Sequence, residues 1–274
     1  DGNSADFETK ATYNLTIKAD DDEANSSSLD YTINVTNVNE QPTSITLGST
    51  SFNENSLSET IGVISTADDD SSDSHTYELS GADAESFEIV SSSLKLKDSI
   101  SANYEVKNSY AITITSTDSG GLTASEDFSL TVNDINDAPS SLSLSASSVA
   151  ENSSGTDVGI LSSTDEDTDD TFTYALSGTD QDFFELSGTT LKLKDASSAN
   201  FETKSSYDIT ITTTDAGGLS KAQDLTVNVT DVNESPTDLG LSETAVAENT
   251  AGVEIGTISA TDPDADDTFT YTLS

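Results

Sequence analysis

The stretch DSGGLTASEDFSLTVNDINDAP, residues 118–139, carries the pattern that decides the fold of this chain. It opens with Asp and a Gly-Gly pair, which mark a tight turn where backbone conformations closed to other residues are accessible. Phe128, Leu130 and Val132 then alternate with polar residues, the period-two pattern of a β-strand with one buried face. The stretch ends in Pro139, which cannot donate to a central strand ladder. It therefore predicts a turn, a half-buried strand and a linker in succession.

The same succession recurs along the chain at a spacing of 97 residues, at 21–42 and at 215–236. A fixed spacing of this kind indicates a repeated structural unit. Two shorter motifs keep the same spacing: an aromatic residue followed by Glu at 7–8, 104–105 and 201–202, and Glu-Asn at 54–55, 151–152 and 248–249. The whole chain is therefore built on one repeat.

The Pro-containing linkers set the predicted repeat boundaries. We expect two complete repeats, 41–137 and 138–234, with the C-terminal part of a repeat at 1–40 and the N-terminal part of another at 235–274. A unit of 97 residues is about the size of a seven-stranded sandwich. We therefore predict an all-β chain of tandem seven-stranded Greek-key sandwiches, immunoglobulin-like in type, in a linear array, and read it as a window from a longer protein. Within the first complete repeat, strands are predicted near 43–48, 60–66, 75–80, 86–90, 93–97, 109–117 and 125–134, with Tyr77, Leu79, Phe87, Ile89, Leu94 and Leu96 facing inward.

Composition excludes several classes of function. The 274 residues include no Cys and one His, so thiolate chemistry, disulfides and multi-His metal sites are excluded. Nine basic residues against 51 acidic ones give a formal net charge of -42, which repels nucleic-acid phosphates and anionic lipid headgroups. We therefore expect no nucleic-acid partner and no direct membrane insertion, and we predict that the chain is not an enzyme.

The acidic residues themselves indicate a cation. Asp pairs such as Asp68 with Asp70 return at the 97-residue spacing in loops that can converge where one sandwich meets the next. Clustered carboxylates repel one another, and a bound dication reverses that repulsion. Calcium suits such a site better than magnesium, because calcium accepts six to eight oxygen ligands in irregular geometry.

In the order and spacing of all these motifs, the chain resembles the extracellular cadherin repeat, particularly its bacterial relatives in large secreted adhesin-type surface proteins. The resemblance covers the whole chain. It implies a cadherin-like sandwich in each repeat and calcium ions at each junction between repeats, with ligands from both sides.

Carried over residue by residue, the resemblance implies acidic and Asn ligands at three junctions. At the first junction they are Glu8, Asn37, Asn39, Glu40, Asp68, Asp70 and Asp118. At the second junction they are Glu54, Glu105, Asp134, Asn136, Asp137, Asp165, Asp167 and Asp215. At the third junction they are Glu151, Glu202, Asp231, Asn233, Glu234, Asp262 and Asp264.

Several positions depart from the family pattern. Asn103 and Asn200 stand where the family has Asp, and neutral ligands bind calcium more weakly, so we expect calcium at every junction without the family's full complement of three ions. Asp73, Asp170 and Asp267 also keep the 97-residue spacing and could supplement the Asp-x-Asp ligands, but the residues favour a turn-forming role at least as strongly, so we leave them out of the ligand set. His75 replaces the Phe of the other repeats, so we expect a partly exposed substitute for an aromatic residue.

The function that these expectations favour is a calcium-stiffened stalk or spacer in an extracellular, cell-surface protein. Two alternatives stay open. One is an adhesion module that binds other cadherin-like repeats, copies of itself or a carbohydrate. The other is a structural subunit of an extracellular filament or surface layer, in which the partial repeats at the two ends complete one another between chains.

Overall fold

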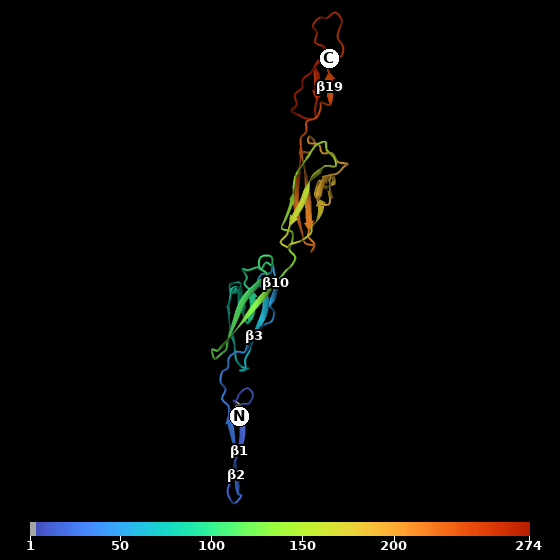
Figure 1. Cartoon of the computed structure of the whole chain (residues 1–274). Coiled ribbons are helices and arrows are strands. Elements are labelled where there is room, and N and C mark those ends of the chain that lie inside the picture. The colour runs from blue at the N-terminus through green and yellow to red at the C-terminus, as the bar shows by residue number, and fades with distance from the viewer. Residues whose placement is uncertain (1–3) are drawn as a thin grey trace. The chain divides into compact units, whose positions relative to one another are not determined.

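The structure is a computed structural model in which residues 4–274 are described. These residues form two units, one ending at Ile135 and the other beginning at Asn136. Each unit contains a complete two-sheet β-sandwich and one further pair of strands (Figure 1). The predicted all-β fold of tandem cadherin-like sandwiches is confirmed. Within the described residues, no helix has the length and hydropathy needed to cross a membrane.

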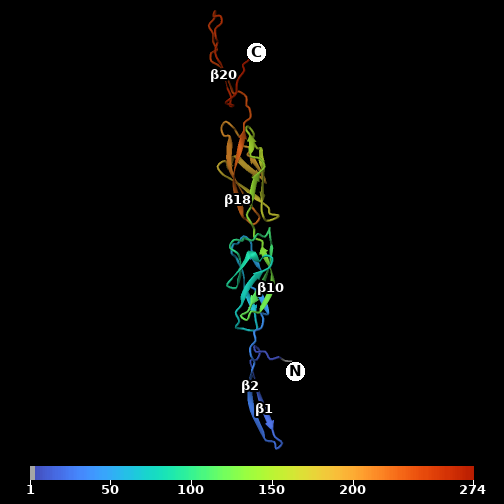
Figure 2. The same cartoon turned by 90° about the vertical axis from the view of Figure 1, so that its left-hand side faces the viewer.

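The first unit begins with an antiparallel hairpin, β1 and β2, which pair from Thr12 opposite Asn34 to Asp20 opposite Ser26 (Figure 2). The complete sandwich follows it. The elements of the described part of this unit are β1 (Thr12–Asp20), β2 (Ser26–Asn34), β3 (Ser44–Leu47), β4 (Ser51–Asn53), β5 (Thr60–Ala67), β6 (Thr76–Ser80), the short 3-10 helix η1 (Ala84–Ser86), β7 (Phe87–Val90), β8 (Ser93–Leu96), β9 (Ser109–Thr117) and β10 (Thr123–Asn133).

The sandwich of the first unit consists of two four-stranded sheets. One has the order β3-β5-β8-β7 and the other β4-β10-β9-β6. All the strand pairs are antiparallel except β4 with β10, which is parallel. The first predicted strand, 43–48, is only the part that pairs with β5. The chain then changes sheets and continues as β4, so β3 and β4 together are the first of the seven strands.

The core lies between the two sheets, as the alternating pattern predicts. Phe87, Leu94 and Leu96 are buried, while Tyr77, Leu79 and Ile89 are partly buried and pack against them. The rings of Phe87 and Tyr110 meet edge to face with centroids 5.4 Å apart, a favoured arrangement for aromatic pairs. The inward-facing residues named from the sequence are therefore confirmed.

The second unit repeats this architecture. Its sandwich has sheets of order β11-β13-β16-β15 and β12-β18-β17-β14, and β19 and β20 form a separate antiparallel pair. Its elements are β11 (Ser141–Leu144), β12 (Ser148–Ala150), β13 (Asp157–Thr164), β14 (Thr173–Ser177), η2 (Gln181–Phe183), β15 (Phe184–Ser187), β16 (Thr190–Leu193), β17 (Ser206–Thr214), β18 (Ser220–Thr230), β19 (Asp238–Leu241) and β20 (Ile258–Thr261). The two cores span 45–132 and 142–229 and fall inside the two predicted complete repeats, whose exact boundaries stay a prediction.

Two glycines are required by backbone geometry. Gly121, in the turn between β9 and β10, has φ of +90°, a conformation that side chains disfavour. Gly62 lies where the β5–β8 register shifts, and a Cβ there would come within 2.7 Å of the backbone nitrogen of Ser49. Glycine at this position lets the segment between β3 and β4 cross close to β5.

Candidate metal centres

Each complete repeat uses one buried Glu to hold the start of the linker that follows it. In the first repeat, Glu54 is 2% exposed. Its Oε2 accepts the backbone N–H of Tyr104 at 2.6 Å, and its Oε1 accepts the N–H of Ile135 at 2.8 Å. A carboxylate that accepts two backbone N–H groups is held in one orientation. Glu54, in the loop after β4, therefore joins the aromatic-Glu segment to the linker that follows the repeat.

The second repeat makes the same contacts one period later. Glu151 accepts the N–H of Phe201 at 2.9 Å and the N–H of Val232 at 2.7 Å. These two hydrogen bonds lower the pKa of the Glu151 carboxyl. Both complete repeats make this pair of hydrogen bonds, so it is a feature of the repeat and not of one copy.

The end of each linker is held by the Asp-x-Asp loop of the repeat that follows. Asp70 Oδ2 accepts the N–H of Glu40 at 3.0 Å, and Asp70 Oδ1 accepts the side-chain amide of Asn37 at 2.9 Å. The corresponding linker N–H groups, those of Asp137 and Glu234, donate to Asp167 at 2.7 Å and to Asp264 at 2.7 Å. All three linkers are thus joined to the downstream loop by one recurring hydrogen bond.

A third contact joins the linker Asn to the Asp before the Gly-Gly turn. Asn39 donates to Asp118 Oδ2 at 3.0 Å, and Asn136 donates to Asp215 Oδ2 at 3.2 Å. Glycine leaves room for that Asn, because a Cβ at Gly120 would lie 2.3 Å from Asn39 Oδ1 and would displace the Asn39 side chain from this position. The Gly-Gly motif therefore also creates the space into which the linker side chain fits.

At the first junction, carboxylates from three segments converge. One oxygen each from Glu8, Glu40 and Asp70 lies within 4.8 Å of the others, and so does one each from Asp68, Asp73 and Asp118. The first group combines the aromatic-Glu pair, the linker and the downstream loop, which is the combination that the sequence predicts.

At the third junction, Glu151, Glu202 and Glu234 place oxygens within 4.8 Å of one another. A cavity of about 680 Å³ opens beside them. Its acidic and amide lining consists of Glu202, Asp231, Asn233, Asp264, Asp266 and Asp267. Asp262 lies next to this lining, because its Oδ1 accepts the N–H of the lining residue Asp264 at 3.2 Å.

The candidate residues of the second junction are divided between the two units. The first unit carries Glu54, Glu105 and Asp134, and the second carries Asn136, Asp137, Asp165, Asp167 and Asp215. In the first unit, Glu54 accepts the N–H groups of Tyr104 and Ile135. In the second unit, Asp167 accepts the N–H of Asp137, and Asp215 accepts the side-chain amide of Asn136. The ligand set at all three junctions stays a prediction.

The electrostatics of these clusters separate two kinds of carboxyl. The pKa of Asp70 is lowered, chiefly by the N–H of Glu40. The pKa of Glu40 is raised by desolvation and then by the carboxylates around it, and the pKa of Asp231 is raised by desolvation and then by the charge of Asp264. A cation would reverse the repulsion that raises these last two pKa values.

The donor set fits a hard cation. Buried carboxylate oxygens without a hydrogen-bond partner occur on three members of these clusters, Glu40, Asp73 and Glu234, and on two further candidate ligands, Asp165 and Asp262. Buried polar atoms ordinarily find a partner, so such oxygens call for an ion or water. The lysine ion pairs among the described residues involve Asp20, Asp83, Asp180 and Glu185, none of which is a candidate ligand.

Two residues behave in ways that the motifs alone did not indicate. Asp73, left out of the predicted ligand set, lies in the cluster with Asp68 and Asp118 and accepts a hydrogen bond from Ser119 at 2.6 Å. His75 is partly exposed, as expected, and its Nε2 lies 3.0 Å from Asp68 Oδ2. The recurrence of Asp73 at Asp170 and Asp267 was the available signal for its placement.

Comparison with known proteins relates the repeats of this chain to cadherin domains. Residues 145–230 match the cadherin domain family. Mouse and human "Protocadherin Fat 4" are 27% identical over 185 residues and 29% identical over 183 residues, in each case over 64% of this chain and 4% of the relative. The chain thus spans a small fraction of the length of these relatives.

The fold also has a counterpart among solved structures. The extracellular domain of protocadherin gamma-B4 superposes with a TM-score of 0.64 at 22% identity, covering 95% of this chain and 44% of that one. At this level of identity the likeness establishes the fold. The sandwiches of this chain are cadherin-like in architecture.

Proposed function

We propose that the chain is a spacer segment of an extracellular protein, in which calcium ions bind between consecutive cadherin-like repeats and stiffen the junctions. The observation that carries the proposal is the state of each linker. A downstream Asp accepts a backbone N–H from all three linkers, and in the second and third linkers an upstream Glu accepts another, while carboxylate oxygens beside the linkers have no hydrogen-bond donor. A bound dication would supply these oxygens with a partner.

The residues of the chain would act in two ways. Glu54 and Glu151, fixed by two backbone N–H groups each, would orient a carboxylate at the upstream face. Asp70 and Asp264, fixed by the linker N–H, would do the same at the downstream face. An ion shared between the two faces would replace mutual repulsion with attraction and reduce the freedom of the linker.

Calcium fits this donor set better than magnesium or zinc. The candidate ligands are carboxylate and amide oxygens, which hard cations prefer, and the chain has neither Cys nor a second His. Extracellular calcium modules bind in about the 10⁻⁴–10⁻³ M range. Affinity in that range would keep the junctions loaded outside the cell.

The same residues bear on where the chain works and on what it does there. We infer that the chain is extracellular, holds other parts of its protein at a distance and carries no enzymatic activity, in keeping with relatives named as protocadherins. The sequence resemblance implies a bacterial affiliation, which stays a prediction. The relatives named above are mouse and human proteins and lend it no support.

Small-angle X-ray scattering with and without chelator tests the stiffening. We expect a longer and better-defined maximum dimension in calcium than in chelator. In the variant Asp165→Asn with Asp167→Asn, that difference should shrink. The matched control, Asp127→Asn with Asp224→Asn, removes two charges from exposed strand positions and should respond as the parent chain does.

An unchanged maximum dimension in the parent chain would contradict the proposal. Equal behaviour of the two double variants would also count against it, because the effect would then follow net charge and not the junction.

A further inference from the structure

The first junction differs from the other two at two positions of the repeat. Asn37 stands where both later linkers have Asp, and His75 stands where both later repeats have Phe. An ionised carboxylate and a phenyl ring cannot donate a hydrogen bond, whereas an amide and an imidazole can. The first junction therefore gains a side-chain donor at each of these two positions.

His75 donates to the carboxylate of Asp68. Its Nε2 lies 3.0 Å from Asp68 Oδ2, and because an ionised carboxylate only accepts, the imidazole nitrogen is the donor. The pair is shielded from water, since the side chains of His75 and Asp68 are 12% and 3% exposed. The other oxygen of Asp68 accepts the N–H of Asp70 at 3.0 Å. Both oxygens of this carboxylate thus have a donor.

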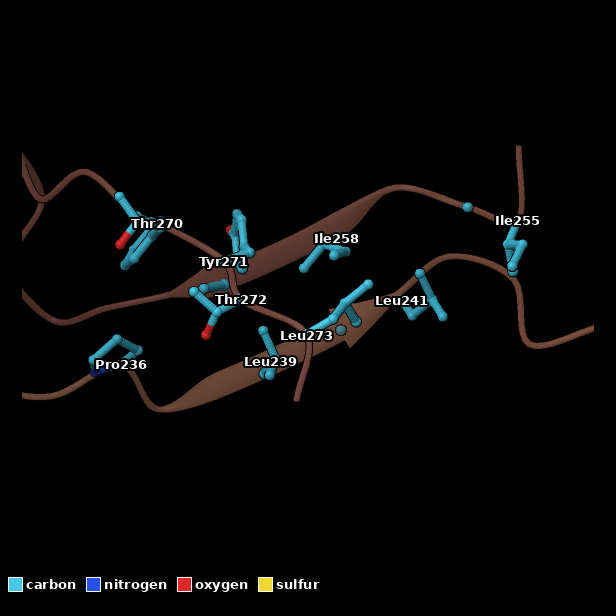
Figure 3. Close-up of a pocket in the computed structure, with 13 residues that line it drawn as sticks. Pro236, Leu239, Leu241, Ile255, Ile258, Thr270, Tyr271, Thr272 and Leu273 are labelled. Carbon is cyan, nitrogen blue, oxygen red and sulfur yellow. The ribbon is translucent and has the colours of Figure 1, made fainter. Parts of the chain in front are cut away.

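The corresponding carboxylates of the later loops each keep one oxygen without a donor. Asp165 and Asp262 accept the N–H two residues further on through Oδ1, each at 3.2 Å, and Oδ2 of each is buried without a hydrogen-bond partner. In the third of these loops the residue at the imidazole position, Phe269, lines an apolar cavity with Leu239 and Ile258 (Figure 3). The oxygen that the imidazole takes at the first junction is therefore the one left without a partner in the other two loops.

Asn37 makes the second difference. Its side-chain amide donates to Asp70 Oδ1 at 2.9 Å, and the N–H of Glu40 donates to Asp70 Oδ2 at 3.0 Å, so this carboxylate also has a donor on each oxygen. At the third junction the same position is Asp231, whose pKa is raised by desolvation and then by the charge of Asp264. A hydrogen bond at the first junction thus stands in place of a repulsion at the third.

We propose that Asn37 and His75 cap the downstream Asp pair of the first junction with N–H groups and so make this junction less dependent on calcium. The inference rests on the proposed function, and it names the residues that set how strongly one junction responds to the ion. An ion at Asp68 must share an oxygen with the imidazole or displace it, and displacement leaves a buried N–H unpaired, which costs binding free energy. Without calcium, the two donors hold carboxylates that would otherwise repel their neighbours.

A direct ligand role for His75 predicts the opposite sign. If the imidazole bound the ion, replacing it by a side chain without donor or acceptor would weaken calcium binding. If it caps Asp68, the same replacement frees a carboxylate oxygen, and calcium binding becomes tighter. Calcium prefers oxygen to imidazole ligands, which favours the second outcome.

Amide hydrogen exchange measured by NMR, in a series from chelator to millimolar calcium, tests this sign. The amides of Glu40 and Asp137 make the recurring bond from linker to downstream Asp, so they report on the first and second linkers. His75→Phe installs the residue of the other repeats, and Phe172→His makes the reciprocal change. His75→Gln keeps a side-chain N–H and is the matched control.

In His75→Phe, the calcium concentration that half-protects the Glu40 amide should fall about threefold or more, because the ion no longer competes with a hydrogen bond to a charged group. The protection of this amide in chelator should fall as well. His75→Gln should behave as the parent chain. Phe172→His should change the Asp137 amide in the opposite direction in both respects, while the amides of β10 and β18 report on the stability of the two sandwiches.

A half-protecting concentration at Glu40 that stays the same or rises in His75→Phe would overturn the proposal. An unshifted Asp137 amide in a Phe172→His chain whose β18 keeps its protection would do the same. If β18 loses protection in that variant, His75→Phe alone decides. A parent chain in which calcium protects neither linker amide would overturn the proposed function together with this inference, whereas a parent that responds at both amides leaves only the capping at issue.

The imidazole itself gives a second measurement, because the chain has one His and its ring signals are therefore unique. We expect the Nε2–H signal of His75 to be present in chelator and to persist at the calcium concentration that protects the Asp137 amide. Loss of this signal at a lower calcium concentration than that would also overturn the proposal.

Discussion

Replacing Glu54 by Gln separates the structural role of the first-loop Glu from its proposed role as a ligand. The carboxylate is 2% exposed and accepts two backbone N–H groups, from Tyr104 at 2.6 Å and Ile135 at 2.8 Å. Gln keeps the shape but has one acceptor oxygen, so its NH₂ faces one of the two N–H donors. The variant loses a charge-assisted hydrogen bond and leaves a buried donor unsatisfied.

The size of the effect follows from these contacts. A hydrogen bond to a charged group contributes about 1.5–3 kcal/mol, and an unsatisfied buried donor costs about 1–3 kcal/mol. Removing one negative charge from an acidic cluster also lessens its repulsion, which offsets part of this free-energy cost. We therefore expect the first sandwich to lose about 2–4 kcal/mol in chelator, which is roughly 30-fold to 1,000-fold in an opening equilibrium.

Hydrogen exchange measured by mass spectrometry reads the two sandwiches separately. In chelator, the amides of β10 should lose protection by this factor in the Glu54→Gln variant, while those of β18 serve as an internal reference. Calcium should increase the protection of β10 in the parent chain and do so less in the variant. Glu126→Gln, which removes the same charge from an exposed position on β10, is the control and should behave as the parent chain.

Exchange of β10 within about threefold of the parent chain would refute the structural reasoning, because threefold corresponds to only about 0.6 kcal/mol. Equal gains in protection from calcium in the parent and the variant would refute the role as a ligand. The two outcomes are separable, since the first is measured in chelator alone.

Three further predictions concern other sites. Lys204 and then the N–H of Asp208 lower the pKa of Asp180, so this carboxylate stabilises the fold above its ordinary pKa of 3.8 and ceases to do so as pH falls below it. Asp180→Asn should therefore cost about 1 kcal/mol at pH 7 in urea unfolding, because Lys204 is 41% exposed and screened, and the difference should shrink as the pH falls below 3.8. Gly217→Ala would place Cβ 1.8 Å from Asn136 Oδ1 and should weaken calcium binding in a titration. Gly218→Ala, where φ is +94° and nothing lies within 4 Å, should strain the backbone without that loss. Chelator should lower the melting temperature in calorimetry, and an equal concentration of magnesium should restore little of it.

Most of the fold could be predicted because burial alternates along each strand. Leu130 and Val132, singled out in the deciding stretch, are 0% and 1% exposed in β10. The short strand β4 escaped prediction because Phe52 is the single apolar residue in its three positions, too few to display a period. Its pairing depends on β10, about 80 residues further along the chain, which no local pattern reports.

The candidate site could be predicted as a set of recurring residues but not as a network. The motifs indicate that Glu54 and the linker matter, whereas the hydrogen bond between them joins residues 81 positions apart. The contact of His75 with Asp68 depends on how the loop folds back at the start of β6, and no repeat supplies a precedent because Phe stands there in the others. Spacing identifies the groups that recur, and only the fold decides which of them meet.

The number of calcium ions that the intact chain retains, measured by native mass spectrometry at millimolar calcium, tests the central claim most directly. The account predicts at least one ion for each of the three linkers, and fewer when both members of a downstream Asp pair are replaced by Asn. A chain that retains no ions, or the same number in that variant as in the parent, would contradict it.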